Sequence, residues 1–460
     1  MGGLGMVRGS FARGGALLLG LAATRLAAQS LALPASDPVG IGRGGAGVAF
    51  GRSLEASALN PALLATLDDR RSAYVAGGME LESGQLTLQS NQRTLFSTDR
   101  NRFVPALGAA WKAGGRVVFG LVLDTPFSRH QQVPMESTSR FLGDHLALRA
   151  DRIQLQAGYK LSDRFSIGLG VGAARLTYES ASTFRAQVPL DPSQVLSTGN
   201  PSQGLVETGL RQSGSGTSPA FSAGFRFAIN PRWTVGGAVQ GPLKASLGLT
   251  AEMDGRAPAV YANDGYGAPN QGTAAAAAQL LGRLSARPGS GDLQLPWRAT
   301  VGVRQRVNQL FTWEFDLRYL GSGQLQVPSA ARLSTPSGLV EAPELAVEAH
   351  SSSGMTLMGE LSLDKRWTVR AAASVEQGWR AEPSVSPLMG GAKTAAFSAG
   401  FGFRMLGGEL IGGYQFRQSK DIDSPSIDGV WSRLGYHTTG TTTRIEGMGH
   451  LWSLGFRRSF

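Results

Sequence analysis

The strongest constraint on the fold is an alternation of large apolar residues with small or polar residues that recurs along the chain. In "RFSIGLGVGAARL", which begins at Arg164, large apolar side chains occupy every second position and serine or glycine lies between them. "LFTWEFDLRYL", which begins at Leu310, places aromatic and aliphatic residues on one side and charged residues on the other. A period of two residues predicts strands with one apolar face and one polar or small face. Most of these segments reach the roughly 9–11 residues that a tilted strand needs to cross a bilayer.

Turn sequences divide the chain after residue 71 into fourteen such segments, because six short turns alternate with seven long stretches rich in Gly, Ser, Pro and Asn. The short turns are "AGG" (113–115), "LSDR" (161–164), "INPR" (229–232), "VNQ" (307–309), "LDKR" (363–366) and "LGG" (406–408), and the long stretches centre near residues 90, 136, 200, 270, 336, 386 and 432. An even number of strands, with short turns at one end and long loops at the other, is typical of outer-membrane barrels. We therefore predict an all-β fold, a fourteen-stranded antiparallel transmembrane β-barrel over residues 72–460.

Aromatic residues support a membrane location. They follow four of the short turns, at Phe165, Trp233, Phe311 and Trp367, as expected for a belt at the periplasmic interface. The chain ends in "HLWSLGFRRSF", and a last strand that closes on a terminal Phe resembles the assembly signal of outer-membrane barrels.

The first thirty residues have the layout of a secretory signal peptide. Arg8 and Arg13 precede the apolar run 16–23, and small residues follow it, as in cleavable leaders. The run is too short to span a bilayer, and cleavage after either Ala28 or Ser30 fits the sequence. The leader also holds Arg25 and no acid, so its removal lowers the formal charge from +11 to +8 (11 − 3). We predict export to the outer membrane of a Gram-negative-type bacterium.

Composition excludes several function classes. The chain has no cysteine, which excludes disulfides and thiol metal sites. Its basic excess contains no Lys/Arg run, so the expected polyanions are outer-membrane lipid and lipopolysaccharide headgroups and not nucleic acid. The five histidines show no metal-ligand spacing, and no "GxSxG" nucleophile elbow occurs. We expect no catalytic residue, no metal and no cofactor; a non-specific porin and an outer-membrane barrel hydrolase are the alternative readings.

A compact segment follows the leader, "GIGRGGAGVAFGRSLEASALNPALLATL" (40–67). A fourteen-stranded barrel encloses a lumen too wide for its own side chains to fill. Small residues let a backbone lie close to the barrel wall, and Asn60 can cap a short helix that has Pro61 at its first position. We predict that residues 31–71 form a hatch inside the lumen.

This segment resembles the N-terminal hatch of the FadL/TodX family, outer-membrane channels for long-chain fatty acids and aromatic hydrocarbons. The resemblance continues through "GYKLSDRFSIGLGVGAARL", "LPWRATVGVRQRVNQLFTWEFDLRYL" and "DKRWTV" to the terminal Phe. It implies passive uptake by a monomer, with capture at the outer loops, a pocket over the hatch and lateral release beside a kinked third strand. The hatch residues that it implies are Gly42, Arg43, Gly44, Ser57, Asn60, Pro61 and Ala62.

Two sites for this route can be placed on the sequence. The third strand, "GRVVFGLVLDTPF", contains Pro126, which cannot donate a ladder hydrogen bond. Asp124 and Thr125 could then satisfy freed backbone groups of a lateral exit, or Pro126 simply ends the strand at the outer rim. In the loop after Tyr261, an alanine run precedes leucines that fit an amphipathic helix; they form either a capture patch or a cover for the barrel mouth, and they are Leu280, Leu281 and Leu284.

The lumen is expected to carry many charges. Alternation directs inward Arg152, Arg226, Arg298, Arg304, Glu314, Asp316, Arg318, Glu360, Arg370, Glu376 and Arg404, and we expect most of them to pair and anchor the hatch. By family resemblance, Arg175 and His350 are the candidates for binding a ligand head group. Which hydrophobic compound is carried is left open among fatty acids, alkanes and aromatics.

Overall fold

The computed structural model describes residues 32–51, 53–87, 93–97, 102–132, 145–189, 203–254, 260–261, 289–327, 332–335, 338–341, 345–378, 393–424 and 443–460. The leader lies outside these residues. Within them, no helix has the length and hydropathy needed to span a bilayer.

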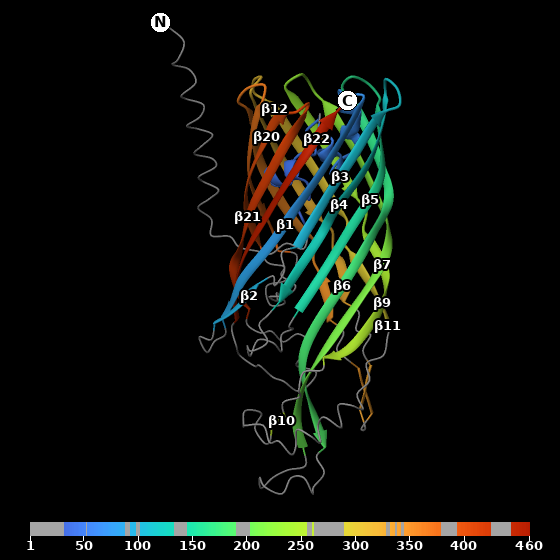
Figure 1. Cartoon of the computed structure of the whole chain (residues 1–460), viewed down its shortest axis with the longest axis vertical. Helices are drawn as coiled ribbons and strands as arrows, with labels where there is room; N and C mark the ends of the chain where they lie inside the picture. Colours follow the sequence, from blue (N-terminus) through green and yellow to red (C-terminus); the bar gives the residue numbers. More distant parts are fainter. Residues whose placement is uncertain are drawn as a thin grey trace.

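Fourteen antiparallel strands form one closed barrel (Figure 1). Each strand pairs with the next one in the ring, and β22 pairs with β1 from Ser72↔Ser459 to Thr87↔Arg444, so the sheet has no free edge there. This confirms the predicted fold class. In ring order the strands are β1 (Arg71–Thr87), β3 (Arg102–Lys112), β4 (Val117–Gln132), β5 (His145–Lys160), β6 (Phe165–Pro189), β7 (Gln203–Ala228), β8 (Trp233–Gln240), β12 (Arg298–Arg306), β13 (Phe311–Leu320), β18 (Ser352–Ser362), β19 (Trp367–Glu376), β20 (Thr394–Met405), β21 (Gly408–Ser424) and β22 (Thr443–Ser459).

Shorter strands extend the sheet at the end with the long loops. β9 (Leu243–Asp254) and β11 (Gly289–Leu295) continue β8 and β12 beyond Gly241 and Pro296, and they pair with each other. The remaining strands are β2 (Arg93–Ser97) on β1, β10 (Val260–Tyr261) on β7, the pair β14 (Gly323–Val327) and β17 (Leu345–Ala349), and the pair β15 (Arg332–Thr335) and β16 (Gly338–Glu341).

The six predicted short turns all connect consecutive strands, and four of them share one mechanism. In each of these four, a side-chain oxygen in the turn accepts hydrogen bonds from the backbone N–H groups two and three residues later, and the second donor is the aromatic residue that opens the next strand. The accepting residues are Ser162, Asn230, Asn308 and Asp364. The rings that open the strands then contact aromatic rings of the adjacent strand, as in Trp367 with its register partner Phe403 at 4.5 Å between centroids. The turn chemistry therefore fixes the register that lines up the aromatic belt.

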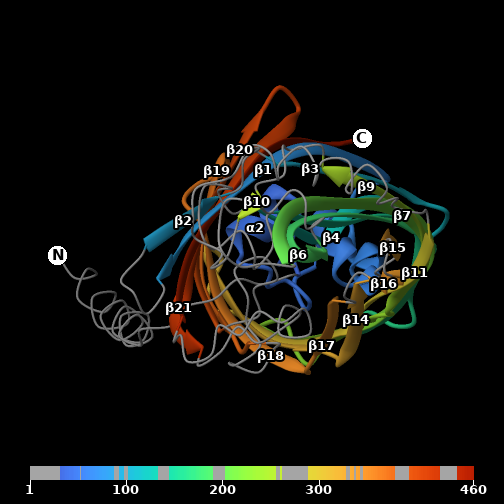
Figure 2. The ribbon, with the colours of Figure 1, turned by 90° about the horizontal axis from the view of Figure 1, so that it is seen from below.

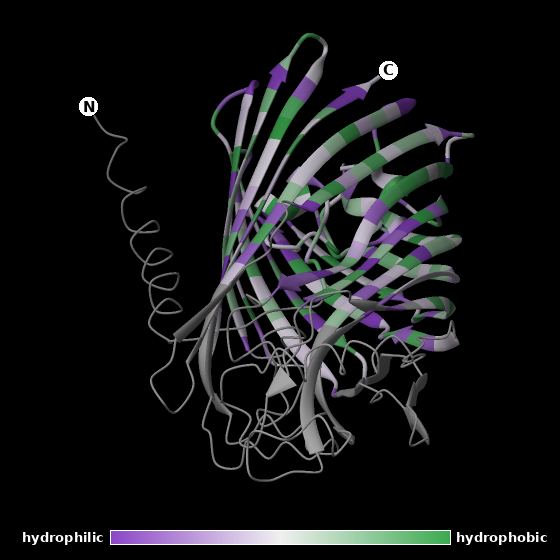
Figure 3. Cartoon of the chain, turned by 60° about the horizontal axis from the view of Figure 1, so that its bottom comes forward, coloured by the Kyte–Doolittle hydropathy of each residue, from purple (hydrophilic) through white to green (hydrophobic). Residues whose placement is uncertain are grey.

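Hydrophobic and hydrophilic residues alternate along many strands (Figure 3), and the two faces of the wall differ accordingly. Leu169 is 63% exposed on the outer face of β6, whereas its neighbours on the inner face pack inside the barrel. On β5 the outward residues are apolar from the short-turn end as far as Ile153. The next two outward residues, Asp151 and Arg149, are charged. On β6 the same change occurs at Arg175, which is exposed. An apolar band therefore surrounds the barrel next to the short turns and ends before the long loops begin.

Arginine at the centre of this band is expected to impair assembly. Leu169→Arg should destabilise the folded state in lipid by about 2–4 kcal/mol, because the charge meets hydrocarbon on the outer face. Heat-modifiable migration after refolding into vesicles measures the folded fraction. Leu161→Arg, at an exposed turn, is the matched control and should fold normally; equal folding of both variants would contradict the assignment of the lipid face.

Candidate functional site

Residues 32–67 lie inside the ring of strands (Figure 2). They form α2 (Pro38–Gly42) and two 3₁₀ helices, η1 (Glu55–Ala58) and η2 (Pro61–Thr66). Their apolar side chains complete three cores with inward-facing strand residues: Leu54, Leu64 and Leu67 with Tyr74, Ala76, Ala106, Ala110 and Val118; Leu33 and Ile41 with Val104 and Leu451; Ala46 and Phe50 with Met358 and Ala372. The hydrophobic core of the barrel interior is thus shared between this segment, here the N-terminal segment, and the wall.

Asn60 joins the N-terminal segment to the wall through one fully buried amide. Its side-chain oxygen accepts from Ala62 N at 3.0 Å and caps η2, and Pro61 is the first helical residue, both as the sequence predicts. The amide nitrogen donates to Val48 O at 2.7 Å and to Phe225 O of β7 at 2.9 Å. One side chain therefore caps a helix, fixes the preceding loop and anchors both to a strand.

Glycines of the wall allow this close approach. A Cβ placed on Gly168 would lie 2.3 Å from the backbone of Pro61 and Ala62, and one on Gly236 would lie 2.3 Å from Val48 O. Glycine at such inward positions lets the backbone of the N-terminal segment lie directly against the strands. Much of the glycine that recurs inside the predicted strands is thereby explained.

Carboxylates of β13 hold the loop before η1. Asp316 accepts hydrogen bonds from Gly47 N at 2.9 Å and Val48 N at 3.2 Å, and Glu314 accepts from Ala49 N at 2.7 Å. Gly47 has a φ of 141°, which favours glycine. These inward charges anchor backbone amides, a use that the sequence pattern did not specify.

A chain of alternating charges starts and ends in the N-terminal segment. Its links measure 2.8, 2.7, 3.9, 2.5 and 2.8 Å between nitrogen and oxygen, and its members in order are Arg43, Glu360, Arg370, Glu409, Arg457 and Glu55. The four inner members come from strands β18, β19, β21 and β22. Three arginines and three glutamates balance, so the chain carries no net charge into the interior.

Two acids of the N-terminal segment titrate differently. Burial, with a smaller contribution from Glu55, raises the pKa of Asp37 to about 6, although its carboxylate accepts from Gly40 N at 2.7 Å and caps α2. Burial opposes ionisation of Glu55 too, but Arg457 and hydrogen bonds with its own backbone and Ser53 lower its pKa below the ordinary value. Glu55 is therefore the charged end of the chain, whereas Asp37 gains a proton in mildly acidic solution.

The ladder between β3 and β4 stops at Leu107↔Leu123. On the other side of β4, the register with β5 shifts between Asp124 and Phe127, so that Thr125 and Pro126 have no partner there. From Asp124 to Arg129 every residue of β4 is buried, in contrast to the alternation below. The third strand is thus broken at the predicted residues, and Pro126 does not end it.

The N-terminal segment and inward side chains meet the freed backbone of this break. Leu33 N donates to Pro126 O at 3.0 Å, and Thr125 N donates to Ser36 Oγ at 3.3 Å. Asp124 forms a bidentate pair with Arg152 at 2.9 and 2.7 Å. Because unpaired backbone is costly at membrane depth, these contacts are what allow the break to exist.

Two narrow cavities lie at the break, above the N-terminal segment. Each has a volume of about 10 Å³, room for about one water molecule. One lies between Leu33, Leu59, Thr125 and Arg298, and the other between Phe127, Phe221, Leu243 and Pro296. Both are bordered by Pro126, Gln240 and Arg298. Arg298 therefore lies where the lumen meets the broken strand.

Arg298 is the cation that borders both cavities. Its side chain is only 4% exposed, its Nη2 donates to Pro126 O at 3.2 Å, and its guanidinium lies 5.6 Å from the Phe127 ring centre. Its Nε has no hydrogen-bond partner, and no carboxylate pairs with it in the part of the chain that the structure describes. The sequence analysis identified Arg298 only as inward-facing. The available signal was its position two residues after Pro296, which lies between β11 and β12.

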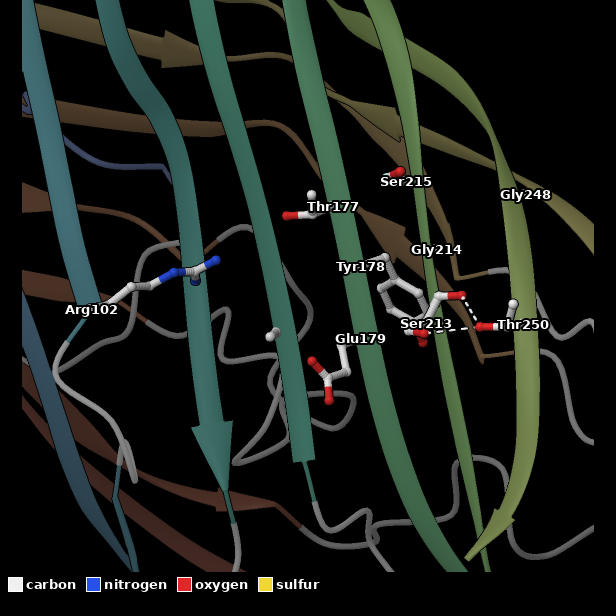
Figure 4. Close-up of a pocket in the computed structure, with 10 residues that line it drawn as sticks. Arg102, Thr177, Tyr178, Glu179, Ser213, Gly214, Ser215, Gly248 and Thr250 are labelled. Carbon is white, nitrogen blue, oxygen red and sulfur yellow. Dashed lines mark hydrogen bonds between the residues drawn. The ribbon is translucent and has the colours of Figure 1, made fainter.

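A separate depression of about 480 Å³ lies toward the long loops (Figure 4). It is lined from β3, β5, β6, β7 and β9, by residues such as Arg102, Thr177, Glu179, Ser213 and Thr250. Ser213 and Thr250 share a hydrogen bond of 3.0 Å. The depression shares no lining residue with the two cavities at the break.

Several predicted site residues are not brought together. Arg175, a head-group candidate by resemblance, is exposed on the outer face of β6, because it shares the parity of Leu169. His350 is exposed between β17 and β18. Leu280, Leu281 and Leu284 lie outside the described residues. Within the described ranges, no group of acidic and histidine side chains has the geometry of a metal site.

The known proteins that resemble this chain have the same kind of fold. A family model described as outer membrane protein transport protein (OMPP1/FadL/TodX) matches residues 19–405. Similar solved structures include a Pseudomonas aeruginosa FadL homologue (16% identity, TM-score 0.71, 94% of this chain and 100% of that chain), the Ralstonia pickettii toluene transporter TbuX (15%, 0.56, 93% and 99%) and the P. putida toluene transporter TodX (12%, 0.61, 93% and 99%). A comparison with curated protein sequences gives no match.

The close packing of the N-terminal segment can be tested at one glycine. Gly168→Ala should lower the free energy of unfolding by about 1–3 kcal/mol, because its new methyl group meets backbone that cannot move aside. Gly170→Ala on the same strand is the control, since the atoms nearest to its methyl group belong to the side chains of Ser222 and Gln156, which can shift, and not to backbone. Thermal unfolding in detergent compares the two; equal losses of stability would argue against tight seating of η2 on β6.

Proposed function

The chain belongs to the OMPP1/FadL/TodX family of outer-membrane transport proteins, and we propose that it takes up hydrophobic small molecules by passive diffusion and releases them sideways into the membrane. The observation that carries this proposal is the broken third strand with a cavity beside it, at Thr125 and Pro126. A molecule that leaves there enters lipid directly. It avoids the aqueous periplasm, where exposure costs about 0.8 kcal/mol per methylene group.

We assign the N-terminal segment the role of a hatch that forms the floor of the path. Its apolar cores, the Asn60 anchor and the alternating charge chain hold it at many points of the wall. A hatch held in this way need not leave the barrel during transport. It closes the lumen to ions and small solutes, which distinguishes this channel from a non-specific porin.

The proposed route begins at the outer surface. Capture by Leu280, Leu281 and Leu284 stays a prediction, as does the action of the protein as a monomer in contact with lipid and lipopolysaccharide. From the loops the ligand would descend to the two cavities above the hatch and pass Arg298 before it reaches the break.

Arg298 favours a substrate with an anionic end and an apolar body. Burying a cation without a counter-ion is costly, and a carboxylate bound to its free Nε would supply the missing charge and hydrogen bond. Phe127, Phe221 and Leu243 provide apolar surface beside it. Among the ligands of this family we therefore propose fatty acids for this chain, although TbuX and TodX are described as toluene transporters.

Removal of the break tests the lateral route. Replacing "DTPF" (124–127) by "DVTF" restores the missing N–H and keeps Asp124 for Arg152. Folding should persist, whereas uptake of a fluorescent fatty acid into vesicle lipid should fall by an order of magnitude or more. Unchanged uptake would favour passage straight through the lumen, and large steady ion currents in planar bilayers would favour a porin.

The substrate class is tested at the buried arginine. Arg298→Met should weaken binding of a long-chain fatty acid about 10- to 100-fold, because a charge-assisted hydrogen bond is lost, and should leave toluene binding nearly unchanged. Arg306→Met, exposed at the short-turn end of the same strand, is the control. Equal losses for both ligands would show that Arg298 supports the cavity and does not select its occupant.

A further inference from the structure

We propose that Arg102 and Arg149 form a latch that closes the gap between β3 and β4 and must open for lateral release. The proposal rests on the proposed function for its role in transport, but the latch itself stands on contacts of the described residues. It identifies the structure as the closed state of the exit.

The gap has a defined edge on β3. Residues 102–106 of β3 remain paired with β1, for example Arg102 with Glu80, but have no ladder partner on β4. Their carbonyl groups on that side face the break, and Phe103 is 59% exposed, toward the outside. Without other donors, this edge would present unpaired backbone to lipid.

Two arginines bridge the gap in opposite directions. Arg149, on β5, donates from Nη1 to Phe103 O on β3 at 2.8 Å. Arg102, on β3, donates from Nη1 to Arg129 O on β4 at 2.8 Å and to Leu148 O on β5 at 3.1 Å. From the break toward the long loops, residues 124–129 of β4 are all buried. The two guanidinium groups therefore connect β3 with β5 across the gap. They replace a backbone ladder by side-chain bonds.

The latch is coupled to the kink. Asp151 orients Arg149 by accepting from its Nε at 2.8 and 2.6 Å. The same carboxylate accepts from the Thr125 hydroxyl at 2.7 Å, and Thr125 is one of the two residues without a register partner on β5. A movement of the kink that displaces Thr125 therefore disturbs the group that holds Arg149 in place.

The position of the latch makes opening feasible. Arg149 lies where the outward apolar band gives way to polar residues, and its side chain is 20% exposed. A released guanidinium can therefore extend toward water and lipid headgroups while its stem stays on apolar surface. The open edge of β3 has no such alternative, so the gap should close again once a ligand has passed.

A static brace would show the same contacts, and a cysteine reporter separates the two roles. The chain has no native cysteine, and Ala106→Cys places a single thiol on the unpaired part of β3, where Ala106 is fully buried. In lipid vesicles, N-ethylmaleimide should label this thiol slowly. Arg149→Met in that background should raise the labelling rate about tenfold, as expected for the loss of one charge-assisted hydrogen bond.

Two controls fix the interpretation. Arg175→Met removes an outward arginine from the neighbouring strand and should leave the labelling rate of Ala106→Cys unchanged. Ala372→Cys places a buried thiol in the core formed with Phe50, and its labelling should not respond to Arg149→Met. Faster labelling at both reporter positions would overturn the latch in favour of a brace for the whole barrel, and no acceleration at either would overturn it as well.

Uptake in the same variants separates the latch from the route. If Arg149→Met accelerates both labelling at Ala106→Cys and fatty-acid transfer into vesicle lipid, the latch gates the exit. Acceleration of labelling with unchanged transfer would keep the latch as a mobile closure and would overturn its role in transport, together with the lateral route.

Discussion

The requirement that every backbone polar group in a membrane be hydrogen bonded determines most of this structure. Fourteen strands that close through β1 and β22 satisfy it with backbone alone. Where Pro126 and Thr125 interrupt the ladder, the requirement is met by other means: Ser36 and Leu33 bond the freed groups from inside, and Arg102 and Arg149 bond them across the gap. The break is therefore a stabilised feature of the fold, since the N-terminal segment, β3 and β5 all supply its hydrogen bonds.

The interior is organised by the opposite need, which is to fill a wide lumen without leaving charges unpaired. Glycine on the inner face lets the N-terminal segment touch the strands, and carboxylates of β13 take up its backbone amides. The alternating chain from Arg43 to Glu55 then neutralises most of the charges that face this region. Arg298 has no carboxylate partner among the described residues, and it lies beside the break, where it donates to Pro126 O.

The sequence predicted what depends on local periodicity and turn chemistry. Strand number, the six short turns, the lipid face around Leu169 and the cap at Asn60 all follow from residues close in sequence. Arg175 was a head-group candidate by family resemblance only, and its even spacing from Leu169 and Val171 already indicated the outer face. Pro126 fitted both a break and a strand end, because the outcome depends on partners such as Ser36 that only tertiary structure supplies. The lack of a carboxylate partner for Arg298 depends in the same way on side chains from several strands.

The alternating charge chain has a consequence for biogenesis. Its wall members belong to β18, β19, β21 and β22, among the last five strands of the ring, whereas its two ends belong to the N-terminal segment. A ring that closed without this segment would leave Glu360 without Arg43 and Arg457 without Glu55, and the loss of one partner of an ion pair is unfavourable. The last strands thus complete their electrostatics only around a seated segment, so that closure of the wall and packing of its contents form one cooperative step with a built-in check on order.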